Sequence, residues 1–166
     1  MVASTVDTGK ISGRRVLHFN SMDELTADVD RLVAAERAGR LRRLGNWTLG
    51  QTLGHLATWM DFAFTGSPLN PPWIIKMIIR LKKKQFFQGP MPAGVKIPGV
   101  EGGTVGTADV PLDEALPHFR KAADRLKNEA PALPHNIFGK LPHDQFIAMN
   151  LRHAELHLGF FIPATD

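Results

Sequence analysis

Four segments of the chain repeat apolar side chains three and four residues apart, which is the spacing of one face of an α-helix. The pattern predicts long helices over about 21–39, 48–66, 112–130 and 142–161. Two of the expected starts, at Ser21 and Thr48, carry a capping box, in which Glu or Gln follows three residues later. No segment reads convincingly as a strand. We therefore expect an all-α fold, an up-down antiparallel four-helix bundle.

The segment between the second and third of these helices differs in composition. Residues 73–81 are apolar except for Lys76 and Arg80, which predicts an extra short amphipathic helix. Residues 88–111 then contain Gly and Pro throughout, with no helical period. We expect a long Gly/Pro-rich loop here, and loops of this length inside a compact domain often have a function.

The length of 166 residues suits one domain. We expect a flexible N-terminal arm over residues 1–14 and a single helical domain over residues 15–166. The chain has no cysteine, which excludes disulfides, zinc–thiolate sites and thiol nucleophiles. Its first residues lack the apolar core of a secretory signal, and no apolar run approaches the ~20 residues of a membrane-spanning helix. We expect a soluble, cytoplasmic protein.

The net charge of +4 comes from one short segment. Residues 76–84 contain five basic side chains and no acidic one, so the rest of the chain is nearly neutral. A local patch of this size does not indicate a protein that coats a polyanion. The apolar residues around it only partly meet the needs of a membrane surface. We expect a small-molecule substrate, no nucleic acid and no membrane partner, and we consider a homodimer possible. The sequence leaves the role of Lys76–Lys84 open.

The most specific chemical feature is a pair of histidines, His153 and His157, in the last predicted helix. Residues four apart lie on one helix face, so the two imidazoles can converge on one metal ion. Chance alone gives such a pair in roughly a quarter of sequences with this many histidines, so the spacing is weak by itself. Phe146 and Asn150 share the same face, which should pack inward. The alternative interpretation is a pair of core histidines satisfied by hydrogen bonds.

His55 is the natural third member of the cluster. It lies on the predicted 48–66 helix, between Thr52 and Trp59, on a face that should also point inward. Three imidazole nitrogens from two helices would leave coordination positions open for water or substrate. They do not distinguish zinc, nickel, manganese and iron. Thr52, Trp59 and Asn150 are then candidates for supporting the ligands or lining the pocket.

Three stretches carry a family resemblance: GNWTLGQTLGHLATWMD, the segment from PPW to MPAG, and HNIFGKLPHDQFIAMNLRHAELHLGF. Together they resemble the DinB-like (YfiT-like) metalloenzyme superfamily over about residues 15–161. Within it the chain is most similar to a family of domains of unknown function, family 1569. The resemblance implies a four-helix bundle that holds a divalent metal through His55, His153 and His157. Relatives often have a further histidine where this chain has Leu156.

The resemblance also bears on the activity. Characterised relatives include enzymes that use a low-molecular-weight thiol as a cofactor. His135 matches a His-X-X-Phe-Gly pattern of the most similar relatives and is a candidate pocket residue. We therefore expect a metal-dependent hydrolase or thiol S-transferase that acts on a small molecule.

The catalytic residues are not identified by the sequence. Asp61 and Glu101 are possible acids, but no spacing ties them to the histidines. The alternative function is a non-catalytic binding or dimerisation module, which would present the basic residues 76–84 to an acidic partner.

Overall fold

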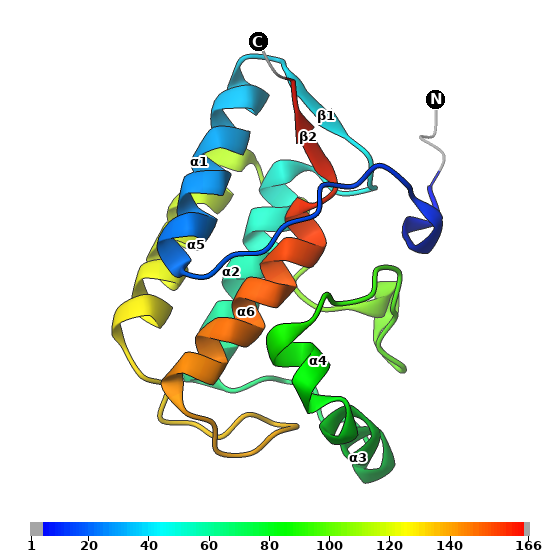
Figure 1. The fold of residues 1–166 in the computed structure, drawn as a ribbon, viewed down its shortest axis with the longest axis vertical. Helices are drawn as coiled ribbons and strands as arrows, with labels where there is room; N and C mark the ends of the chain where they lie inside the picture. The colour runs from blue at the N-terminus through cyan, green and yellow to red at the C-terminus, as the bar shows by residue number, and fades with distance from the viewer. Residues whose placement is uncertain (1–4, 165–166) are drawn as a thin grey trace.

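A computed structural model describes residues 5–164 of the chain. This part is mostly helical, with six α-helices and one two-stranded sheet (Figure 1). The helices are α1 (Met22–Arg37), α2 (Leu49–Thr65), α3 (Trp73–Leu81), α4 (Lys83–Gln88), α5 (Leu112–Asn128) and α6 (His143–Leu158). The strands are β1 (Leu41–Arg43) and β2 (Phe161–Pro163), and two 3₁₀ turns lie at Thr8–Lys10 and Glu101–Gly103.

Local side chains fix the starts of the first two helices. The Ser21 hydroxyl accepts a hydrogen bond from the Glu24 N–H at 3.2 Å, and α1 begins at the next residue after Ser21. The Thr48 hydroxyl accepts from the Gln51 N–H at 3.0 Å in the same way. Each bond satisfies one of the N–H groups that a helix start leaves without an intrahelical partner. Both predicted N-caps are therefore confirmed.

The sheet corrects the expectation that the chain has no strand. β1 and β2 pair in antiparallel register, with Leu41 opposite Pro163 and Arg43 opposite Phe161. Strands of three residues are too short to show an alternating pattern in the sequence. The pairing also shortens the last helix, which ends at Leu158 and not near Phe161.

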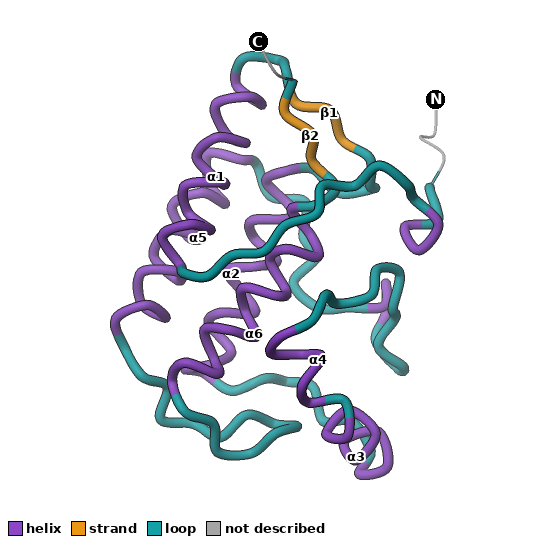
Figure 2. The backbone as a smooth tube through the Cα atoms, in the orientation of Figure 1, coloured by secondary structure: helices purple, strands orange, loops and turns teal. Residues whose placement is uncertain are grey.

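The predicted short amphipathic helix over residues 73–81 is confirmed as α3, but a second helix that the sequence did not predict follows it. Residues 73–88 form two helices, α3 and α4, which meet at Lys82. Neither helix contributes a buried residue. Figure 2 shows both beside the four long helices, followed by the predicted long Gly/Pro-rich loop.

One hydrophobic core joins the four long helices. Leu25 of α1, Leu53 of α2, Phe119 of α5 and Leu158 of α6 are all fully buried within it. Leu25, Leu53 and Phe119 lie on the apolar faces that the sequence predicted, whereas Leu158 lies beside the predicted inward face of the last helix. Burial of these side chains supplies the main driving force for folding. The core fixes α2 next to α6, which is the pair of helices that carries the histidine cluster.

One ion pair to α1, and hydrogen bonds between Phe19 and a buried ion pair of α6, attach the segment before α1 to the helices. The Arg15 guanidinium donates to both Asp28 carboxylate oxygens at 2.8 Å. Burial alone would raise the pKa of Asp28, but the hydrogen bonds and charges of Arg15 and Arg31 outweigh it and lower the pKa. On α6, Arg152 pairs with Glu155 at 2.7 Å. Further hydrogen bonds hold residues 15–19 against α6. Figure 1 shows this segment running across α6.

Two glycines of α2 offer a matched test of the packing between α2 and the start of α5. A Cβ added at Gly50 would lie 2.3 Å from the Val110 carbonyl oxygen, whereas one at Gly54 would meet nothing nearer than 3.9 Å. We expect Gly50→Ala to destabilise the protein by about 1–3 kcal/mol, because the backbone must move. Gly54→Ala should be neutral or stabilising by about 0.5–1 kcal/mol. Urea unfolding measures both, and equal effects would contradict the packing described.

Candidate metal centre

Three histidine rings from two helices meet inside the fold. His55 comes from α2, and His153 and His157 come from α6, one turn apart. The His153 Nε2 atom lies 3.2 Å from His55 Nε2 and 3.1 Å from His157 Nε2. The three candidate ligand atoms all lie within 4.8 Å of one another, so the cluster could hold a metal ion. The structure thus brings together the three histidines that the sequence singled out.

Hydrogen bonding alone does not account for this arrangement. His55 Nδ1 lies 2.8 Å from the Val105 carbonyl oxygen, which can only accept, so Nδ1 carries the proton and Nε2 carries a lone pair. His153 Nε2 contacts two other nitrogens, yet it has either one proton or one lone pair to offer. At least one of the two contacts therefore remains unfavourable without a further group. A cation among the three nitrogens would use all three lone pairs, so the donor set fits a divalent metal.

The electrostatics of the cluster keep the rings neutral. Burial lowers the pKa of His55 to about 4. Burial also lowers the pKa of His153 and of His157 well below the ordinary value, and the charge of neighbouring imidazoles lowers both further. At neutral pH all three rings then offer unprotonated nitrogens, which is the form that binds metals.

Two tryptophans hold the histidine rings in place. Trp47 stacks on His157 with 5.1 Å between ring centroids and 7° between the planes. Trp59 meets His153 edge to face at 5.1 Å and 64°. Trp47 was not among the predicted site residues. It directly precedes the Thr48 cap of the helix that carries His55. This position was the sequence feature that could have identified Trp47 as a site residue.

A large pocket of about 960 Å³ opens beside the cluster. His55 is fully buried and does not line it, but its ring contacts two histidines that do. The loop after α4 contributes one wall through residues 91–97 and 102–104. The predicted site residues that line the pocket are Thr52, Trp59, His135, Asn150, His153 and His157. The volume and the mixed lining suit a small molecule.

His135 lines this pocket, and its hydrogen bonds define its tautomer. Its Nδ1 accepts hydrogen bonds from the backbone N–H groups of Ile137 at 3.1 Å and Phe138 at 3.3 Å. The neutral ring therefore carries its proton on Nε2. Burial lowers the pKa of His135 to about 4, so the ring is neutral near pH 7. In this state it offers one N–H group and no positive charge.

The two candidate acids lie elsewhere. Asp61 pairs with His118 at 2.7 Å, and both side chains are well exposed to solvent. Glu101 is exposed in the second 3₁₀ turn, and neither acid lines the pocket. Asn150 does line it, and its side-chain amide donates to the Phe146 carbonyl at 2.9 Å. No general base is therefore identified among the acids that the sequence suggested.

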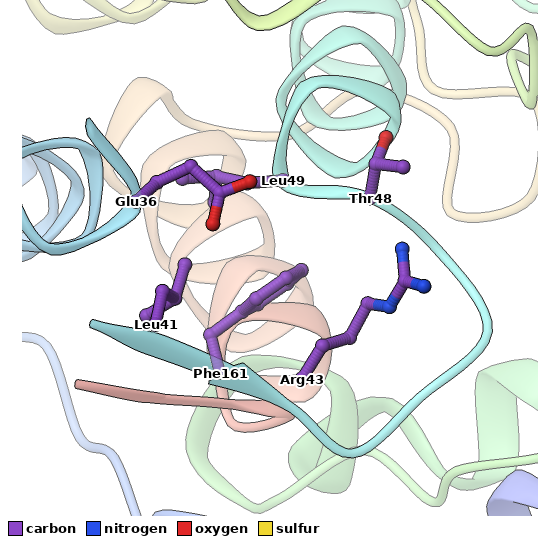
Figure 3. Close-up of a pocket in the computed structure, with 6 residues that line it drawn as sticks. All are labelled: Glu36, Leu41, Arg43, Thr48, Leu49 and Phe161. Atoms are coloured by element: carbon purple, nitrogen blue, oxygen red, sulfur yellow. The ribbon is translucent and has the colours of Figure 1, made fainter. Parts of the chain in front are cut away.

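A second hollow lies away from the histidines. Figure 3 shows this pocket of about 320 Å³ between β1, the end of α1 and the start of α2. Its lining residues are Glu36, Leu41, Arg43, Thr48, Leu49 and Phe161. It contains none of the predicted site residues.

The lowered pKa of His135 predicts a pH dependence of stability. Because the unfolded chain binds a proton near pH 6.5 and the folded one only near 4, stability should fall as the pH drops through this window. The free energy of unfolding of the metal-free wild type should decrease between about pH 7 and 5.5. In His135→Asn we expect this decrease to be smaller by about 1 kcal/mol. Urea unfolding at both pH values measures this difference. An identical pH dependence of the variant and the wild type would contradict the burial of His135.

Comparison with known proteins completes the description of the site. The chain matches the model of a family described as a protein of unknown function (DUF1569) over residues 11–164, which include all three histidines. No curated protein matches the chain. No solved structure matches it either. Because the match spans nearly the whole sequence, the chain belongs to the DUF1569 family of proteins of unknown function.

Proposed function

We propose that the protein is a divalent-metal-dependent enzyme that acts on a small molecule, either as a hydrolase or as a thiol S-transferase. The observation that carries this proposal is the convergence of three imidazole nitrogens, from the buried His55 and the half-buried His153 and His157, within 4.8 Å at one side of a large pocket. The four long helices that share one core support the further proposal of a DinB-like four-helix bundle. His55, His153 and His157 would hold the ion.

A divalent ion bound there would act as a Lewis acid and would lower the pKa of a bound water or thiol. The protein's own groups prepare the site for this chemistry. Val105 fixes the proton of His55 on Nδ1, so that Nε2 is available as a ligand. Trp47 and Trp59 restrict the other two rings. The orientation of the ligands is therefore set before any ion binds.

The pocket provides the groups that would position a substrate. The His135 Nε2–H would donate to an oxygen of the substrate, where negative charge develops during acyl or thiol transfer. In thiol transfer the sulfur forms a bond to an electrophilic carbon, the leaving group departs with its electron pair, and the thiol proton passes to solvent. The wall formed by residues 91–97 would decide which substrates fit. The proposed cofactors are thus a divalent ion and, for the transferase, a low-molecular-weight thiol.

The proposal is tested by activity of the metal-loaded protein. Protein made without a histidine tag is stripped with a chelator and reloaded separately with zinc, nickel, manganese or iron. Each form is assayed with a panel of small esters and amides, and with electrophiles plus a low-molecular-weight thiol. We expect turnover that requires an ion and disappears in His55→Ala. Equal rates with and without metal, or turnover unchanged in His55→Ala, would contradict the proposal.

A further inference from the structure

The helix α3 exposes an apolar face that the core does not use. Five of its nine residues are large apolar side chains that are at least 45% exposed. These are Trp73 (71%), Ile74 (49%), Met77 (47%), Ile78 (45%) and Leu81 (82%). At 100° per residue they cover one continuous arc of about 140°. Monomeric proteins rarely leave so continuous an apolar surface in water, so this face is expected to contact something.

Positive charge flanks both edges of this face. By helical spacing, Lys76 and Arg80 lie along the edge next to Trp73, where they donate to the Asn70 side chain and the Ile137 carbonyl. Lys82 lies beyond the opposite edge and is exposed. Lys83 and Lys84 follow, and the sequence has no acidic residue between Asp61 and Glu101. An apolar arc with cations along both sides is the pattern of a helix that lies in a lipid interface. There the long side chains reach up to the headgroups while the arc enters the acyl region.

We propose that α3 docks on the surface of a membrane that contains anionic lipids. No helix in the described part of the chain is long and apolar enough to cross a bilayer, and α3 has only nine residues, so the contact would be peripheral. A second copy of this chain fits less well, because a two-fold contact would bring the cations of both copies together. The sequence alone did not favour a membrane, because this segment only partly provides the wide basic face and the bulky apolar residues of a membrane surface. The exposure of these apolar side chains in the structure favours a membrane contact.

The docking surface is independent of the histidines, although it lies close to the pocket. Ile79, about 170° from the centre of the exposed arc, and Phe86 of α4 line the pocket on the other side of this segment. Membrane docking would therefore bring a wall of the pocket near the lipid surface. Since no exposed residue of the arc is a proposed metal ligand, lipid binding should survive His153→Ala. Metal binding and lipid binding therefore depend on different residues, so a negative result for one does not decide the other.

The test is sedimentation of the full-length protein with vesicles. We expect binding to vesicles of phosphatidylcholine with phosphatidylglycerol, little binding to pure phosphatidylcholine, and weaker binding as salt increases. The fluorescence of Trp73 should shift to the blue on binding, and the shift should be absent in Trp73→Phe. No binding to either kind of vesicle would overturn the proposal.

Matched variants separate the two contributions. Lys82→Gln with Lys84→Gln should lower the partition coefficient about 30-fold, while Lys121→Gln with Lys140→Gln, at exposed positions elsewhere, should leave it unchanged. Ile74→Ser with Leu81→Ser should lower it at least about tenfold, and Val16→Ser, fully exposed, should not.

Light scattering without lipid tests the competing occupant. A dimer that dissociates in the Ile74→Ser, Leu81→Ser variant would overturn the proposal in favour of self-association. A monomer that binds anionic vesicles supports the membrane contact.

Discussion

Replacing His153 with alanine should lower the affinity of the protein for a divalent cation by at least about 100-fold. His153 is the central ring of the cluster, because its Nε2 contacts the Nε2 atoms of both other histidines. Its loss would leave two imidazoles from different helices with a gap between them. Calorimetric titration of zinc into chelator-treated, untagged protein measures the change. The fold should persist, since alanine removes a ring that the structure places at a pocket wall.

The matched control for this variant is His118→Ala. His118 is exposed, pairs with Asp61 and does not line the pocket, so its replacement should leave zinc affinity unchanged. Equal affinity of the wild type and His153→Ala would contradict the proposed centre. A similar loss in both variants would indicate binding by scattered surface histidines.

Arg152→Met should destabilise the protein by about 3–5 kcal/mol. The Arg152 and Glu155 side chains are only 5% and 8% exposed, and they lie 2.7 Å apart on α6. The Arg152 guanidinium also donates to the Phe19 carbonyl, which lies in the segment before α1. Methionine preserves much of the volume but leaves the Glu155 carboxylate without its cation in a buried place. At this size the change should lower the melting temperature by roughly 10 °C.

Arg31→Met provides the comparison. Arg31 also pairs with a buried carboxylate, that of Asp28, but its own side chain is 64% exposed and Asp28 keeps its bidentate bond to Arg15. We expect a cost below about 1 kcal/mol, as for other exposed ion pairs. Urea unfolding of both variants decides the point. Equal costs would show that burial of the Arg152–Glu155 pair does not govern its contribution.

The fold could be predicted wherever the determining contacts are local. The N-caps at Ser21 and Thr48 each bond to a backbone group three residues later, so the sequence displays cap and helix together. The strands β1 and β2 have no such signal, because they consist of three residues each and their paired residues lie about 120 positions apart in the sequence. The helix α4 was not predicted, because its six residues are too few to show a helical repeat.

In the candidate site, too, the contacts that are local in the sequence could be predicted and the long-range ones could not. His153 and His157 are one helical turn apart, and His55 lies on an inward face, so helix geometry alone predicted that they could meet. The Val105 carbonyl that fixes the His55 proton comes from the long loop, whose path no periodicity specifies. For the candidate acid Asp61, a position on the same helix as His55 was not sufficient. Its carboxylate contacts His118 and does not face the pocket.

The most direct measurement is a crystal of the untagged protein soaked with zinc and examined at the zinc absorption edge. The account predicts one strong anomalous peak within about 2.0–2.2 Å of the Nε2 atoms of His55, His153 and His157. Density for water or another small ligand should complete the coordination on the side of the pocket. Three rings with no peak among them, or a peak bound only by surface histidines, would contradict the central claim.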